Sequence, residues 1–198
     1  MKFLGKTPSS KILQEELTYK QGQTGNNRRI KELLLEEQKN FCAYTEKYLQ
    51  GLDSSEVEHF DSSIKYSDDY YNYYAVTRAA NQYKKDEDYS GSSFFETLFF
   101  HDTEDLSTRI KYIKEEGVYE EVDESDQEAI DFIDFLGFNH PVLFEQRRRH
   151  IKRLKRNFKD AGYDDNDCLQ YFRDYNEDLN FITAIESELR LDLSEFYL

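Results

Sequence analysis

The sequence predicts an α+β fold that is mostly helical, with one small β-hairpin embedded among the helices. Apolar residues recur at helical spacing in residues 28–40 and 141–160. Short runs rich in β-branched and aromatic residues occupy 57–60 and 72–76, and the turn signals Gly51 and Ser54-Ser55 precede the first of them. These two kinds of segment together indicate a helical protein that contains a local sheet.

The first half of the chain contains the predicted hairpin. A helix over residues 28–40 is expected, capped by Asn26 or Asn27. Its inward side is expected to carry Ile30, Leu33, Leu34 and Gln38. Short strands at 42–44 and 57–60 precede a return strand at 72–76 and a helix at 78–85.

The second half is predicted to be helical. Residues 86–93 are polar and contain glycine and serine, which indicates a linker, so we divide the chain into residues 1–90 and 91–198. Helices are expected at residues 106–116, 125–136, 141–160 and 166–191. Pro141 fits the first turn of its helix, where its missing N–H does no harm. The inward stripe of this helix is expected to consist of Phe144, Ile151, Leu154 and Phe158.

Four polar residues around the hairpin form a pattern that suits phosphodiester hydrolysis. Such a reaction needs a base for the attacking water and a cation for the charge on the phosphate. His59 suits the base because an imidazole titrates near neutral pH. Glu58 and Asn81 offer the oxygen ligands that magnesium prefers, and Asn72 is suited to hold the connecting loop through main-chain hydrogen bonds. Because neighbouring strand residues face opposite sides, the backbone is expected to bend near Phe60.

The residues that surround this pattern resemble a known family. Residues 35–46, 57–60, 72–76 and 81–84 are similar to the HNH endonucleases of bacterial anti-phage systems, close to the PtuB-type subunits of Septu systems and of some retrons. Residues 106–110, 129–139 and 147–155 resemble the helical tail of the same family, so the resemblance covers roughly residues 28–158.

The resemblance implies a ββα-metal fold that binds Mg²⁺ or Mn²⁺. His59 would be the general base, Glu58 and Asn81 the metal ligands, and Asn72 the structural asparagine. It also implies an ABC-type ATPase of the PtuA kind as partner. The acidic and apolar C-terminal third is the segment expected to dock with that partner.

The chain departs from the family at the positions of a zinc knuckle. Relatives commonly carry two Cys-x-x-Cys pairs, whereas this chain has Cys42 and Thr45 at the first pair and Thr77 and Ala80 at the second. Three of the four thiolates are missing, so no structural zinc is expected. Aromatic packing is expected to hold the hairpin instead, with most of the rings of residues 70–74 buried rather than stacked on bases.

Composition limits the location of the protein. Two distant cysteines among 198 residues provide no disulfide framework and suit a reducing cytoplasm. No apolar run approaches the roughly 20 residues that span a bilayer, so no membrane partner is expected.

Net charge opposes a role with nucleic acid, because the chain carries −15 and phosphate-binding surfaces are generally basic. The positive charge is concentrated in residues 147–156, where Arg148, Arg149 and Lys152 are candidates for phosphate contact. The alternative for this helix is an exposed face that pairs with the chain's own carboxylates. Lys84 and Lys85 are further candidates, and their alternative is an ordinary exposed helix end.

These expectations combine into a metal-dependent HNH endonuclease that acts as an anti-phage effector. DNA and structured RNA such as tRNA both remain compatible as substrate. The alternative is a hairpin that has lost catalysis and serves as a scaffold or interaction subunit. The missing cysteines and the acidic balance favour this alternative, and the intact set of Glu58, His59, Asn72 and Asn81 opposes it.

Overall fold

The computed structural model describes residues 2, 6–20, 24–51, 53–85, 88–97 and 103–198. It has an α+β fold with two separate two-stranded antiparallel sheets among helices, and the sequence predicts this class but only the first of the two sheets. The helices are α1 (Lys11–Gln14), α2 (Thr24–Glu37), α3 (Arg78–Tyr83), α4 (Phe94–Thr97), α5 (Thr103–Arg109), α6 (Gln127–Phe135), α7 (Pro141–Ala161), α8 (Asp165–Asp174), α9 (Ile182–Leu189) and α10 (Ser194–Tyr197). The strands are β1 (Ser55–His59), β2 (Tyr73–Thr77), β3 (Ile110–Ile113) and β4 (Val118–Glu121), and short 3-10 turns cover Ser62–Ile64, Tyr70–Asn72 and Asn176–Asp178.

The first sheet is a hairpin that leads directly into a helix. β1 pairs with β2 from Ser55 opposite Thr77 to His59 opposite Tyr73. The Thr77 hydroxyl accepts a hydrogen bond of 3.1 Å from the N–H of Ala80, which caps α3. The predicted return strand and the helix after it are therefore confirmed.

Helix α2 packs against this sheet through the predicted side. Ile30, Leu33 and Leu34 are buried, and so is the polar Gln38 just beyond the helix. The Gln38 amide donates to the carbonyls of Phe41 and Ala75 at 2.7 and 2.9 Å and accepts from the N–H of Ala75 at 2.8 Å. Its polar atoms are thus satisfied inside the protein, which explains why an amide belongs on an inward face.

Two segments differ from the predicted strands and helices near the hairpin. Residues 42–44 form no strand; they follow an isolated bridge between Phe41 and Tyr48 and continue as a turn. The predicted helix 106–116 ends at Arg109 and is followed by the hairpin of β3 and β4. Glu115 and Gly117 adopt positive φ angles of 72° and 76°, which reverses the chain and ends any helix there.

The C-terminal helices agree in part with the prediction. Helix α7 begins with Pro141 and ends at Gly162, which has a φ of 69°. Ile151, Leu154 and Phe158 are buried as predicted, whereas Phe144 is only half-buried. The helix predicted for 166–191 is interrupted between α8 and α9, where Phe181 takes a left-handed φ of 64°.

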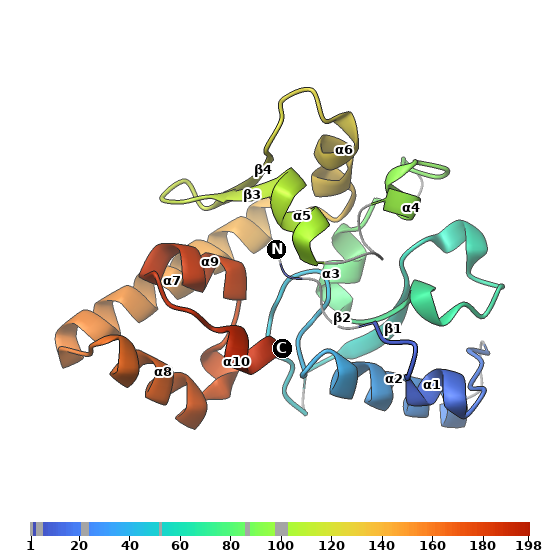
Figure 1. Ribbon diagram of the computed structural model, residues 1–198, viewed down its shortest axis with the longest axis horizontal. Helices are drawn as coiled ribbons and strands as arrows, with labels where there is room; N and C mark the ends of the chain where they lie inside the picture. The colour runs from blue at the N-terminus through green and yellow to red at the C-terminus, as the bar shows by residue number, and fades with distance from the viewer. Residues whose placement is uncertain (1, 3–5, 21–23, 52, 86–87, 98–102) are drawn as a thin grey trace.

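The first helices and the long C-terminal helices lie on opposite sides of the structure. Figure 1 shows α1 and α2 beside β1 and β2 on one side, and α7, α8 and α9 on the other. The apolar residues of the acidic C-terminal third pack with α7 and Phe41 in one cluster, so they are used inside the chain rather than exposed for docking.

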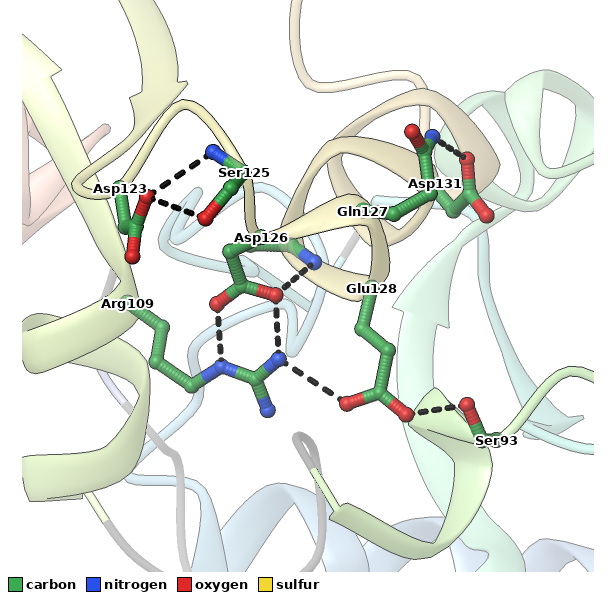
Figure 2. Close-up of polar contacts among 9 residues, drawn as sticks. Ser93, Arg109, Asp123, Ser125, Asp126, Gln127, Glu128 and Asp131 are labelled. Atoms are coloured by element: carbon green, nitrogen blue, oxygen red, sulfur yellow. Dashed lines mark hydrogen bonds and ion pairs between the residues drawn. The ribbon is translucent and has the colours of Figure 1, made fainter.

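A second cluster continues across the predicted boundary at residue 90. The ring of Phe60 lies 5.2 Å from that of Phe95 and 5.6 Å from that of Phe135. Polar contacts reinforce this region (Figure 2), where the guanidinium of Arg109 binds both carboxylate oxygens of Asp126 and also Glu128, at 2.5 to 2.9 Å. None of the helices in the described part of the chain is both long and apolar enough for a membrane span.

Candidate active site

A cleft of about 930 Å³ lies beside β1 and α2. Three of the four predicted site residues line it, and Asn72 lies at the base of the loop that borders it. Its walls consist of Tyr19, Lys20, Asn27, Arg28, Lys31, Glu56, Val57, Glu58, His59, Lys65, Tyr66, Asp68 and Asn81. The cleft is thus built from the N-terminal segment, α2, β1, the β1–β2 connection and α3.

Glu58 is held by a lysine from α3's C-terminal end. The Lys84 ammonium forms an ion pair with Glu58, and it donates to the carbonyls of His59 and Phe60 at 2.7 and 3.2 Å. The Lys84 side chain is only 1% exposed. The sequence predicted either a phosphate contact or an exposed helix end for Lys84. Neither description matches, because the ammonium is buried against the C-terminal end of β1.

His59 is the last residue of β1, and its ring is enclosed by two tyrosines. The ring centroids of Tyr19 and Tyr73 lie 4.9 and 5.1 Å away, both nearly perpendicular to the imidazole. Its Nε2 atom is buried and has no hydrogen-bond partner among the described residues. Burial and the nearby charge of Lys84 lower the pKa of His59, so the imidazole is neutral at pH 7 and able to accept a proton.

Asn72 makes the loop contacts that were expected of it. Its side-chain Oδ1 accepts from the N–H of Asp61 at 2.7 Å, and its Nδ2 donates to the Asp61 carbonyl at 2.9 Å. The Asn72 carbonyl also accepts from the N–H of Phe60 at 2.9 Å. The backbone that follows His59 is therefore fixed on both sides, and Asn72 itself is buried.

Asn81 and Glu56 contact one another in the wall of the cleft. The Asn81 Nδ2 atom donates to Glu56 at 2.9 Å, which leaves its Oδ1 as the oxygen for another ligand. Glu56 was not predicted, although it stands two residues before Glu58 and so shares its face of β1. That period of two is the signal that would have found it.

Three of the four positions of the missing zinc knuckle lie close together in the fold, namely Cys42, Thr77 and Ala80. The Cys42 Sγ atom accepts from the N–H of Thr77 at 3.4 Å, and Thr77 in turn caps α3 at Ala80. Hydrogen bonds and the buried packing of Cys42 and Ala80 therefore join the segments that four thiolates would otherwise connect. The expectation of no structural zinc stays a prediction.

The basic residues predicted for α7 lie outside the cleft. Arg149 pairs with Glu145 one turn earlier at 2.7 Å, whereas Arg148 and Lys152 are exposed. Lys85 pairs with Asp134 at 2.7 Å, although its side chain is 44% exposed. Arg149 thus pairs with one of the chain's own carboxylates, as in the alternative for α7, and Lys85 is exposed, as in the alternative of an ordinary helix end.

No group of three or more His, Cys, Asp or Glu side chains suited to a metal occurs within the described ranges. The predicted ligand set of one carboxylate and one amide is of a different kind, since Mg²⁺ commonly keeps several waters. No model of a protein family matches the chain. No curated protein is significantly similar to it either.

Proposed function

We propose that this protein is a metal-dependent endonuclease of the HNH type that hydrolyses phosphodiester bonds in DNA or structured RNA. The observation that carries the proposal is the meeting of Glu58, His59 and Asn81 in one cleft of a β-β-α unit, with Asn72 fixing the loop. The resemblance of residues 28–158 to anti-phage HNH nucleases supports the same function.

In the proposed reaction His59 takes a proton from the attacking water. Its lowered pKa keeps it neutral at physiological pH, which a general base requires. Lys84 and Asn72 act as positioning residues, because they hold the backbone on either side of the imidazole. A displaced imidazole would lose alignment with the substrate phosphate.

The oxygens around the cleft fit a hard divalent cation such as Mg²⁺ or Mn²⁺. Asn81 presents Oδ1 while its Nδ2 is bound by Glu56, and Glu58 adds a carboxylate. Once bound, the ion would stabilise negative charge on the phosphate. Lys84 already offsets the charge of Glu58, so we expect modest metal affinity.

We further propose that the nuclease is an anti-phage effector that works with an ABC-type ATPase. Its net charge of −15 would repel free nucleic acid at long range, so a partner that controls access suits the chain. Exposed acidic side chains of α8, rather than the buried apolar ones, are the groups available for that contact.

Cleavage assays test the proposal. Wild-type and His59→Ala proteins are incubated with plasmid DNA and with total tRNA, with Mg²⁺, with Mn²⁺ or in EDTA, with and without the product of the neighbouring gene. We expect cleavage that needs both the metal and His59. His140→Gln is the matched control, because His140 lies at the start of α7 outside the cleft. Full cleavage activity of the His59→Ala protein would refute the proposed mechanism.

The second candidate function is a scaffold subunit without catalysis. The Glu58–Lys84 ion pair and the enclosed Nε2 atom of His59 favour it, since both restrict the proposed site. Titration of Mg²⁺ or Mn²⁺ into the protein, followed by NMR of His59 and by thermal stability, separates the two. A scaffold shows no specific site, whereas the nuclease shows a shift that Asn81→Ala weakens.

A further inference from the structure

The charge of the cleft differs from that of the whole chain. The protein has 26 basic and 41 acidic residues, but the cleft walls carry four basic residues against three carboxylates. The basic residues are Lys20, Arg28, Lys31 and Lys65. They come from the N-terminal segment, from α2 and from the β1–β2 connection, so only the fold brings them together.

The three carboxylates of the cleft are already engaged. Glu58 pairs with Lys84, Glu56 accepts from Asn81 and lies 3.5 Å from Arg78, and Asp68 accepts from the Tyr73 hydroxyl at 2.9 Å. Lys84 and Arg78 thereby offset part of the negative charge that would repel an approaching anion.

The four cations are less compensated. Lys20 and Lys65 form no ion pair with any carboxylate in the part of the chain that the structure describes. Lys31 donates to the carbonyl of Ser55 at 3.4 Å, and Arg28 has one pair with Glu32 while 78% of its side chain stays exposed. The rim of the cleft therefore offers positive charge to phosphate groups.

One wall of the cleft carries an exposed aromatic ring. Tyr66 lies on the β1–β2 connection and is 81% exposed, with the Lys65 ammonium 5.1 Å from its ring centroid. A tyrosine face next to a cation is the combination on which an unpaired base stacks while its phosphate is neutralised. A base within a duplex has no free face for such a contact.

The depth of the site also favours a flexible strand. His59 lies between Tyr19 and Tyr73, with one ring nitrogen buried. His59 lines a cleft of about 930 Å³, which cannot hold the full cross-section of a double helix. A short unpaired stretch has the size and flexibility to enter.

We propose that this cleft binds an unpaired stretch of nucleic acid, with phosphates on Arg28, Lys31, Lys20 and Lys65 and a base against Tyr66. The inference rests on the proposed nuclease function and specifies its substrate as a single strand or a loop. It also moves the phosphate contacts from α7 to the rim of the cleft.

Fluorescence anisotropy tests the assignment with wild-type protein in EDTA, so that binding is measured without cleavage. The probes are labelled oligo-dT and oligo-U of about 12 nucleotides, and a blunt duplex of the same length. Both single strands are expected to bind at least tenfold more tightly than the duplex. The ratio of the affinities for oligo-dT and oligo-U shows whether the cleft prefers DNA or RNA.

Paired variants locate the contact. Arg28→Ala/Lys31→Ala is expected to weaken single-strand binding roughly tenfold and to reduce the salt slope by about 1.4, since each contacted phosphate adds about 0.7. Arg148→Ala/Lys152→Ala removes two exposed cations of α7 and is expected to retain wild-type affinity. Tyr66→Ala should lower the affinity for single strands roughly tenfold, whereas Tyr66→Phe should retain it. Tyr175→Ala is the control, because it removes an exposed ring outside the cleft.

Equal affinity for duplex, or loss of binding in the α7 variant rather than the α2 variant, would overturn the inference. Single-strand binding that depends on Arg28 and Lys31, together with cleavage that does not depend on His59, would support the binding site and refute the nuclease mechanism. Cleavage that requires His59 without any preference for single strands would do the reverse.

Discussion

Replacement of Lys84 by methionine should destabilise the protein far more than the same change at its neighbour Lys85. The Lys84 side chain is 1% exposed and its partner Glu58 is 11% exposed, whereas Lys85 and its partner Asp134 are 44% and 49% exposed. Lys84→Met leaves a buried carboxylate without its counter-charge and removes the donor to two carbonyls. Loss of one partner from a buried pair costs about 3–5 kcal/mol. An exposed pair contributes about 0–1 kcal/mol.

The assay is urea unfolding followed by circular dichroism, together with thermal melting. For a chain of this size each kcal/mol corresponds to about 2–4 °C, so Lys84→Met should lower the melting temperature by roughly 10 °C. Lys85→Met should change it by less than about 4 °C. The double variant Glu58→Gln/Lys84→Met should recover part of the loss, because it also removes the carboxylate charge that Lys84 offset. If Lys84→Met and Lys85→Met have the same free energy of unfolding, the reasoning from a buried ion pair is refuted.

The remaining predictions concern the histidines and the loop asparagine. Because burial lowers the pKa of His59, the cleavage rate should stay constant from pH 8 to about 6.5 and fall only below that, as rates measured across this range will show. His150 is half-buried, and desolvation together with the charge of Arg153 lowers its pKa, so it stabilises the fold above its unfolded pKa of about 6.5 and loses this contribution as pH falls through its folded pKa. The unfolding free energy of the wild type should therefore decrease with acid below pH 6.5, and His150→Gln should show a smaller decrease over this window. Asn72→Ala should lower the free energy of unfolding in urea by about 1–3 kcal/mol and reduce cleavage, because the N–H and carbonyl of Asp61 both lose their hydrogen bonds to Asn72. Unchanged stability would contradict the role of Asn72 in the loop.

Local patterns in the sequence determined several elements of this fold. Helix α2 buries Ile30, Leu33 and Leu34 because apolar residues at helical spacing share one side. The strand before α3 was likewise predicted, since residues 72–76 form an aromatic and β-branched run. The polar set Glu58, His59, Asn72 and Asn81 was visible as residue types suited to hydrolysis.

Short segments were less predictable, because their periodicity is ambiguous. The sequence of β3 has apolar residues at positions that suit a helix as well as a strand, and the reversal at Glu115 and Gly117 decides between them. The interruption between α8 and α9 likewise depends on local backbone conformation, since Tyr175 leaves the helical region after α8 and Phe181 is left-handed just before α9.

The chemistry of the cleft was decided by tertiary structure. Lys84 was identified from sequence as a cation, but its pairing with Glu58 crosses 26 residues and follows from how α3 packs on β1. The sequence by itself determined the total charge of −15 and the identity of each ionisable group. Only the fold places Arg28, Lys31 and Lys65 in the walls of one cleft, because local charge depends on distances in space that no spacing along the chain specifies.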